Sequence, residues 1–104
     1  FYKVNMRINK QQHHNIKKIV HLLAGAQAIV TLFGSRVDDT KKGGDVDILV
    51  QLPTDIDNPA LFAAKLSVRI SNLMQGRKVD VILEAPNLDY QTIHQYAHLN
   101  GVIL

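Results

Sequence analysis

The chain has 104 residues and a formal net charge of +3, and 46% of its residues are hydrophobic. This composition fits one globular domain and argues against disorder. The absence of cysteine excludes disulfides, zinc–thiolate sites and cysteine nucleophiles. The charge suits an anionic ligand such as a nucleotide, but it is too small and too scattered to indicate direct nucleic-acid binding.

The length also limits the domain organisation. We expect a single domain over residues 1–104, with no room for a second substrate-binding domain, so a large substrate must be held by this surface or by a partner. The first residues, 1–10, lack the apolar core of a signal peptide, and no apolar run approaches the roughly 18 residues of a spanning helix. We therefore expect a cytoplasmic protein without a membrane partner.

The N-terminal third predicts a helix followed by a buried strand. Helical spacing begins near Asn9 and Gly25 stands where the helix should end, with the apolar stripe Ile16, Ile19, Val20 and Leu23. Residues 28–33 form a short β-branched apolar run that Gly34 stops. Residues 36–44 are polar and end in two glycines, which predicts a loop.

The remaining residues predict two more strands and two more helices. The second strand runs from Asp45 to Leu52, and a helix opens at Asn58-Pro59, a cap residue followed by proline at the first helical position. This helix closes at Gly76 and buries Phe62, Leu66, Ile70 and Leu73. A third strand follows over 78–83, then a last helix over about 88–98. The apolar tail 102–104 either docks on the core or adds an edge strand.

The order helix, strand, loop, strand, helix, strand, helix indicates a small mixed α/β sheet. The long connection between the second and third strands contains a helix, so these two strands should be parallel. The shorter loop between the first and second strands favours an antiparallel pair. We expect the helices to pack on one face of the sheet, opposite the face that carries the acidic side chains.

Three aspartates mark the starts of the second and third strands. Asp45 and Asp47 point to one face of their strand because side chains alternate, and Asp80 enters the parallel strand at a similar height. Two like charges about 4 Å apart repel by roughly 4 kcal/mol at an effective dielectric of about 20, so the cluster needs raised pKa values or a bound cation. An all-oxygen cluster suits Mg²⁺ or Mn²⁺. One such aspartate alone is more often a solvated turn residue, and the spacing of three gives the pattern its weight.

Gly34 and Ser35 follow the first strand directly. Glycine permits a tight turn and close approach of a phosphate, and the backbone amides at a following helix start would attract an anion together with the serine hydroxyl. Taken alone, the pair is more typical of an ordinary turn at the end of a strand.

Together these elements resemble the signature of the DNA polymerase β-like nucleotidyltransferase superfamily: a hydrophobic residue, Gly-Ser, a short spacer, then acid–hydrophobic–acid–hydrophobic. Here Leu32-Phe33-Gly34-Ser35-Arg36 precedes Asp45-Val46-Asp47-Ile48, with nine residues between Ser35 and Asp45. Arg36 and the tail from Ile93 to Leu104 are similar to the minimal nucleotidyltransferase branch. The loop at 37–40 is more acidic than is usual there.

The resemblance implies a nucleotidyltransferase fold and a role for each residue of the motif. The implied site residues are, for the nucleotide, Gly34, Ser35 and Arg36 and, for two Mg²⁺ ions, Asp45, Asp47 and Asp80. The third acid, Asp80, would also activate the attacking hydroxyl. ATP is the expected substrate, with pyrophosphate as the leaving group.

Minimal members of the family often accompany helical HEPN toxins. The resemblance therefore implies an antitoxin that transfers AMP from ATP to a hydroxyl, expected to be a tyrosine, of a HEPN partner. The alternative is an inactive module that neutralises such a partner by contact, through exposed apolar residues of the last helix and tail: Tyr96, Val102, Ile103 and Leu104. Transfer to a small molecule is disfavoured because the chain has no acceptor domain.

Histidines contribute less to the predicted site. His94 and His98 are four residues apart, a spacing that can hold a metal on a helix, but the sequence offers no third ligand. We expect both to lie on the surface of the last helix.

Overall fold

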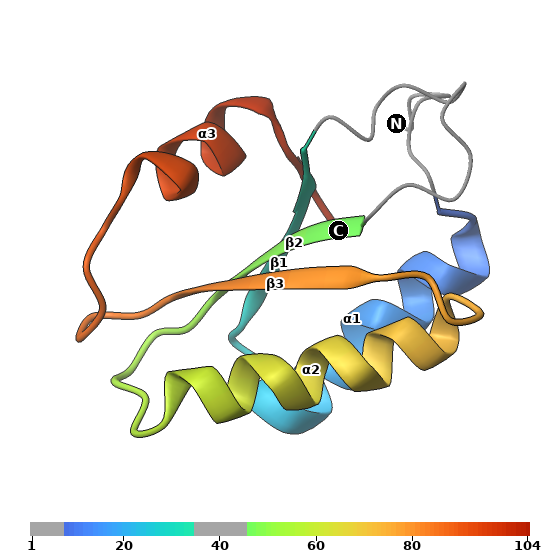
Figure 1. Cartoon of the computed structure of the whole chain (residues 1–104), viewed down its shortest axis with the longest axis horizontal. Coiled ribbons are helices and arrows are strands. Elements are labelled where there is room, and N and C mark those ends of the chain that lie inside the picture. The colour runs from blue at the N-terminus through green and yellow to red at the C-terminus, as the bar shows by residue number, and fades with distance from the viewer. Residues whose placement is uncertain (1–7, 35–45) are drawn as a thin grey trace.

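The computed structural model of the chain describes residues 8–34 and 46–104. Along the chain it contains α1 (Lys10–Ala24), β1 (Ile29–Phe33), β2 (Val46–Gln51), α2 (Pro59–Leu73), β3 (Val79–Glu84), α3 (Thr92–Asn100) and β4 (Val102–Ile103). The strands form one sheet in the order β3-β2-β1-β4 (Figure 1). The pair β1–β2 is antiparallel and the pair β2–β3 is parallel, which confirms the predicted mixed sheet.

Helices α1 and α2 cover one face of this sheet (Figure 1). Alternation along β2 turns Val46, Ile48 and Val50 toward these helices, and each side chain is at most 1% exposed. The helices contribute their apolar stripes to the same core, with Ile16 and Val20 from α1 and Leu66, Ile70 and Met74 from α2. The expectation of helices on one face holds for α1 and α2.

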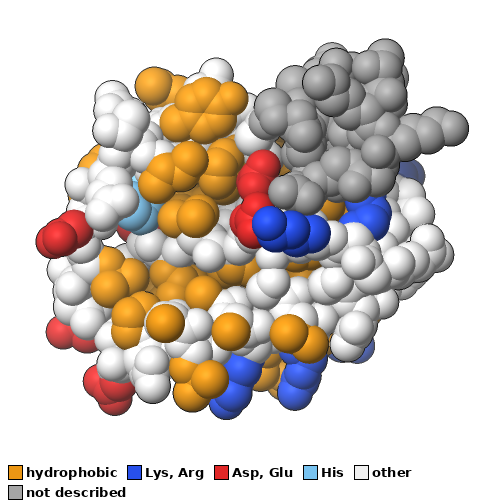
Figure 2. All heavy atoms as spheres, viewed as in Figure 1, with side chains coloured by type: hydrophobic (Ala, Val, Ile, Leu, Met, Phe, Trp, Pro, Cys, Tyr) orange, Lys and Arg blue, Asp and Glu red, His pale blue; other side chains and the backbone are white. Residues whose placement is uncertain are grey.

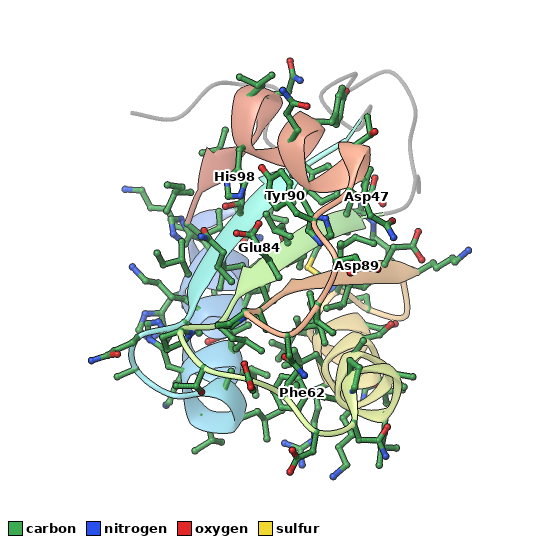
Figure 3. The ribbon with its side chains drawn as sticks, turned by 90° about the vertical axis from the view of Figure 1, so that its left-hand side faces the viewer. Asp47, Phe62, Glu84, Asp89, Tyr90 and His98 are labelled. Carbon is green, nitrogen blue, oxygen red and sulfur yellow. The ribbon has the colours of Figure 1, made fainter. Side chains whose placement is uncertain are left out.

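Helix α3 lies on the opposite face of the sheet (Figure 3). The side chains that alternate to this face in the three long strands include Phe33, Leu49 and Ile82, and they form a second apolar cluster with Ala97 of α3. These apolar groups need cover, and the small Ala97 side chain lets the helix come close. Helix α3 therefore covers part of the sheet face that carries the aspartates.

The first two helices begin where the sequence predicts. Asn9 caps α1, since its Oδ1 accepts the Gln12 N–H at 2.8 Å and its own N–H donates to Gln12 Oε1 at 3.0 Å. Pro59 opens α2. The last helix was predicted too early, because Leu88 belongs to a turn in which its N–H donates to Ala85 O at 3.0 Å.

The C-terminal residues form an edge strand, which is one of the two predicted outcomes. Val102 of β4 pairs with Leu32 of β1, and the Leu104 N–H donates to Val30 O at 2.9 Å. Leu104 is 6% exposed whereas Ile103 is 69% exposed. The expectation that Leu104 lies on the surface is therefore wrong. None of the helices in the described part of the chain is long and apolar enough to span a bilayer.

Candidate nucleotide and metal site

Two of the three predicted carboxylates stand side by side. The parallel register of β2 and β3 pairs Asp47 directly with Asp80, and neighbouring strands lie about 4.8 Å apart. Because side chains alternate, Asp47 and Asp80 both point to the face that α3 partly covers. Val46 and Val79 point to the other face, into the main core. The predicted alignment of Asp80 with Asp47 thus agrees with the structure.

Gly34 brings the backbone at the end of β1 against the Asp47 carboxylate. Phe33 is the register partner of Asp47, and the next residue, Gly34, has a φ of +102°, a conformation that favours glycine. A Cβ atom at this position would overlap the Asp47 carboxylate. The backbone of Gly34 therefore packs directly against this acid, and any larger residue there would push the Asp47 carboxylate aside.

The Asp80 side chain is partly exposed and lies near a lysine. It is 44% exposed, and its Oδ1 lies 3.9 Å from the Nζ of Lys78, which is 70% exposed. An ion pair this exposed contributes little to stability. It nevertheless places the positive charge of Lys78 beside an acid that is predicted to bind a metal ion.

The other predicted site residues, Ser35, Arg36 and Asp45, lie outside the described residues. Within residues 8–34 and 46–104, no group of three or more acids, histidines or cysteines is placed to hold a metal ion. The donor set that the structure does bring together, two adjacent carboxylates beside the Gly34 turn, fits a hard divalent cation such as Mg²⁺. Metal binding by all three aspartates remains a prediction.

The expected surface position is wrong for His94. The ring is 5% exposed, and its Nδ1 accepts the Gln91 N–H at 2.9 Å. Its Nε2 therefore carries the proton and donates to Leu83 O at 2.8 Å. A carbonyl partner eleven residues away leaves no local signal, so spacing along the helix could not distinguish this structural role.

The remaining histidines lie apart from the paired carboxylates. His98 contacts Glu84 at the far end of β3, with 2.7 Å between Nε2 and Oε1, and Tyr90 stacks on it (Figure 3). His13 lies on α1, where burial, followed by the charges of Lys17 and His14, lowers its pKa. None of these groups joins Asp47 and Asp80.

The fold and the adjacent carboxylates correspond to a known class. A sequence profile described as a nucleotidyltransferase domain matches residues 14–98, and the chain belongs to this family. Its fold is similar to that of a chain in the structure of the tri-AMPylated Shewanella oneidensis HEPN toxin in complex with MNT antitoxin, with a TM-score of 0.54 and 23% identity. The similarity covers 88% of this chain and 70% of that chain. No curated protein matches this sequence.

Proposed function

We propose that the chain is a metal-dependent nucleotidyltransferase that transfers AMP from ATP to a hydroxyl of a HEPN-type partner and so acts as an antitoxin. The observation that carries this proposal is the register of Asp47 with Asp80 beside the Gly34 turn. Membership of the nucleotidyltransferase family supports the reaction type. The AMP-modified HEPN toxin in the structurally similar complex supports the choice of nucleotide and partner.

The chain's own residues would position the reactants. Asp47 and Asp80, with Asp45, would hold two Mg²⁺ ions, which when bound supply neutralisation of the phosphate charge. The Gly34 turn would let the triphosphate approach the backbone closely. The acceptor oxygen would then attack the α-phosphorus as the bond to the bridging oxygen of pyrophosphate breaks, and Asp80 would take the hydroxyl proton.

The test is label transfer from ATP labelled at the α-phosphate to a HEPN protein from the same genome. We expect transfer that requires Mg²⁺ and falls by roughly 100-fold or more in Asp47→Asn, since even outer-shell partners of a metal are worth 10–100-fold. The matched control is Asp55→Asn, which changes an exposed acid on the loop between β2 and α2. Equal labelling by Asp47→Asn and the parent chain would show that the site is misassigned.

Exposed apolar side chains favour a second candidate, neutralisation of a partner by contact alone. Four of them lie on α3 and β4: Ile93, Tyr96, Leu99 and Ile103, which are 38–74% exposed. Such side chains are typical of protein interaction surfaces. If Asp47→Asn neutralised the partner fully without ATP, contact would be sufficient and the transfer reaction would not be the antitoxin activity.

A further inference from the structure

The proposed site groups follow one another across the sheet. Gly34 follows β1, Asp47 lies on the central β2 and Asp80 lies on β3, the outermost described strand on that side. In phosphoryl and nucleotidyl transfer the attacking and leaving oxygens lie roughly in line. If the triphosphate occupies the Gly34 side, as the proposed function assumes, the attacking hydroxyl lies on the Asp80 side, toward the outer edge of β3.

The backbone groups of β3 point alternately toward β2 and toward the outer edge of the sheet. The Val46 N–H donates to Lys78 O at 2.9 Å and the Leu52 N–H donates to Glu84 O at 2.8 Å. The backbone groups of the even-numbered residues of β3 therefore point toward β2. The backbone groups of Val79, Val81 and Leu83 consequently face outward.

Two of the three outward carbonyls have partners from the helices. Val79 O accepts the Ser67 hydroxyl of α2 at 2.5 Å, and Leu83 O accepts the His94 Nε2–H of α3 at 2.8 Å. The backbone of Val81 lies between them, and no described residue hydrogen-bonds to it. Among the described residues, Val81 is therefore the outward position whose backbone carbonyl has no partner, one residue beyond Asp80.

A hollow of about 400 Å³ opens at the same position, between α2 and α3. Its walls are mainly apolar, with Ala60 and Ala63 from α2, Ile82 from β3 and Ile93 from the start of α3. Figure 2 shows hydrophobic side chains gathered along this side of the molecule. Asp89 is the one acid among the described lining residues, which include no lysine or arginine. These features suit an apolar side chain and disfavour a phosphate.

We propose that the acceptor segment of the partner polypeptide binds in an extended conformation along the outer edge of β3. Its main chain pairs with Val81, an apolar side chain enters the hollow, and a hydroxyl side chain reaches Asp80. Residues two apart in an extended segment point the same way and are about 6.6 Å apart. Asp80 and the hollow-lining Ile82 have this spacing on β3, so the apolar residue stands two positions from the hydroxyl residue.

This inference rests on the proposed function, and its test uses synthetic tyrosine peptides as acceptors. The peptides differ only at the position two residues from tyrosine, which is leucine in one set and aspartate in the other. We expect the parent chain to transfer AMP to the leucine set with a kcat/KM roughly 10-fold or more higher, because the hollow buries an apolar side chain favourably and would strip water from an aspartate.

Filling the hollow provides the matched variants. Ala60→Trp occupies it from an exposed position on α2, whereas Ala64→Trp changes another exposed alanine of that helix which does not line the hollow. Ala60→Trp should remove the leucine preference through KM, and Ala64→Trp should retain it. Both variants should bind Mg²⁺–ATP in calorimetry as the parent does.

Three outcomes would overturn the inference. The preference could be absent, it could survive Ala60→Trp, or ATP could bind without transfer to any peptide. A parent chain that shows no Mg²⁺-dependent ATP binding would instead contradict the proposed function itself, and the docking inference with it. Calorimetry therefore separates the two failures.

Discussion

At the scale of single residues, Gly34 is the position where backbone conformation and site geometry meet. Its φ of +102° alone would favour glycine, and the contact with the Asp47 carboxylate would demand it independently. Gly25 separates these two causes, because its φ is +101° but nothing lies within 4 Å of a Cβ built there. The two glycines thus share one backbone constraint and differ in one contact.

Gly34→Ala and Gly25→Ala should therefore both lower stability, Gly34→Ala by more because its Cβ would overlap the Asp47 carboxylate, and their effects on ligand binding should differ. Gly25→Ala should lose about 1–3 kcal/mol of unfolding free energy through its backbone conformation alone, and Gly34→Ala more, measured by urea denaturation. Only Gly34→Ala should weaken Mg²⁺–ATP binding, by roughly 10-fold or more in calorimetry, because Asp47 must move. Equal ATP affinity in both variants would contradict a site beside Gly34.

The residues that could be predicted from the sequence are those whose position follows from strand alternation. Asp47 and Asp80 each lie near the start of a strand with an apolar residue on both sides. Side-chain alternation in each strand therefore predicts which face each aspartate occupies, and the parallel pairing of the two strands predicts that they lie side by side. The exposure of Asp80 and its contact with Lys78 depend on neighbouring elements. No spacing along the chain encodes them.

At the scale of elements, strands and their pairing were predictable while the start of α3 was not. Apolar runs bounded by glycine or proline define β1, β2 and β3, and the helical crossover requires β2 and β3 to be parallel. Residues 88–91 resemble a helix start in composition, yet Leu88 is held in a turn by Ala85 and packs against the main core. Tertiary packing, rather than local propensity, sets where this helix begins.

The two histidines of α3 provide a test of this packing. His94→Ala removes a buried ring and leaves Leu83 O without its donor, so we expect a loss of about 2–4 kcal/mol of unfolding free energy. His98→Ala removes a partly exposed contact with Glu84 and should cost under about 1 kcal/mol. Urea denaturation of both variants measures the difference. Equal losses would show that the contact with Leu83 does not hold α3 on the sheet.

At the scale of the whole molecule, the site and the docking hollow are assembled from segments that are distant in the chain. Gly34, Asp47 and Asp80 come from three adjacent strands, and the hollow combines residues near 60, 82 and 93. Family membership and the motif spacing could identify the first set from the sequence. The second set has no motif, because it exists only once α2 and α3 lie on either side of β3.

Because the proposed ligand would join three strands, binding should stabilise the entire fold and not one loop. At ten times its Kd, Mg²⁺–ATP should add about 1.4 kcal/mol to the free energy of unfolding. For a domain of this length each kcal/mol raises Tm by roughly 4–8 °C, so we expect an increase of roughly 6–11 °C in scanning calorimetry. ATP with a chelator, and Mg²⁺–ATP with Asp80→Asn, should each give a clearly smaller increase at the same concentration. A shift that is the same with and without Mg²⁺ would mean that ATP binds away from the paired carboxylates, and the proposed metal site would then have no part in holding it.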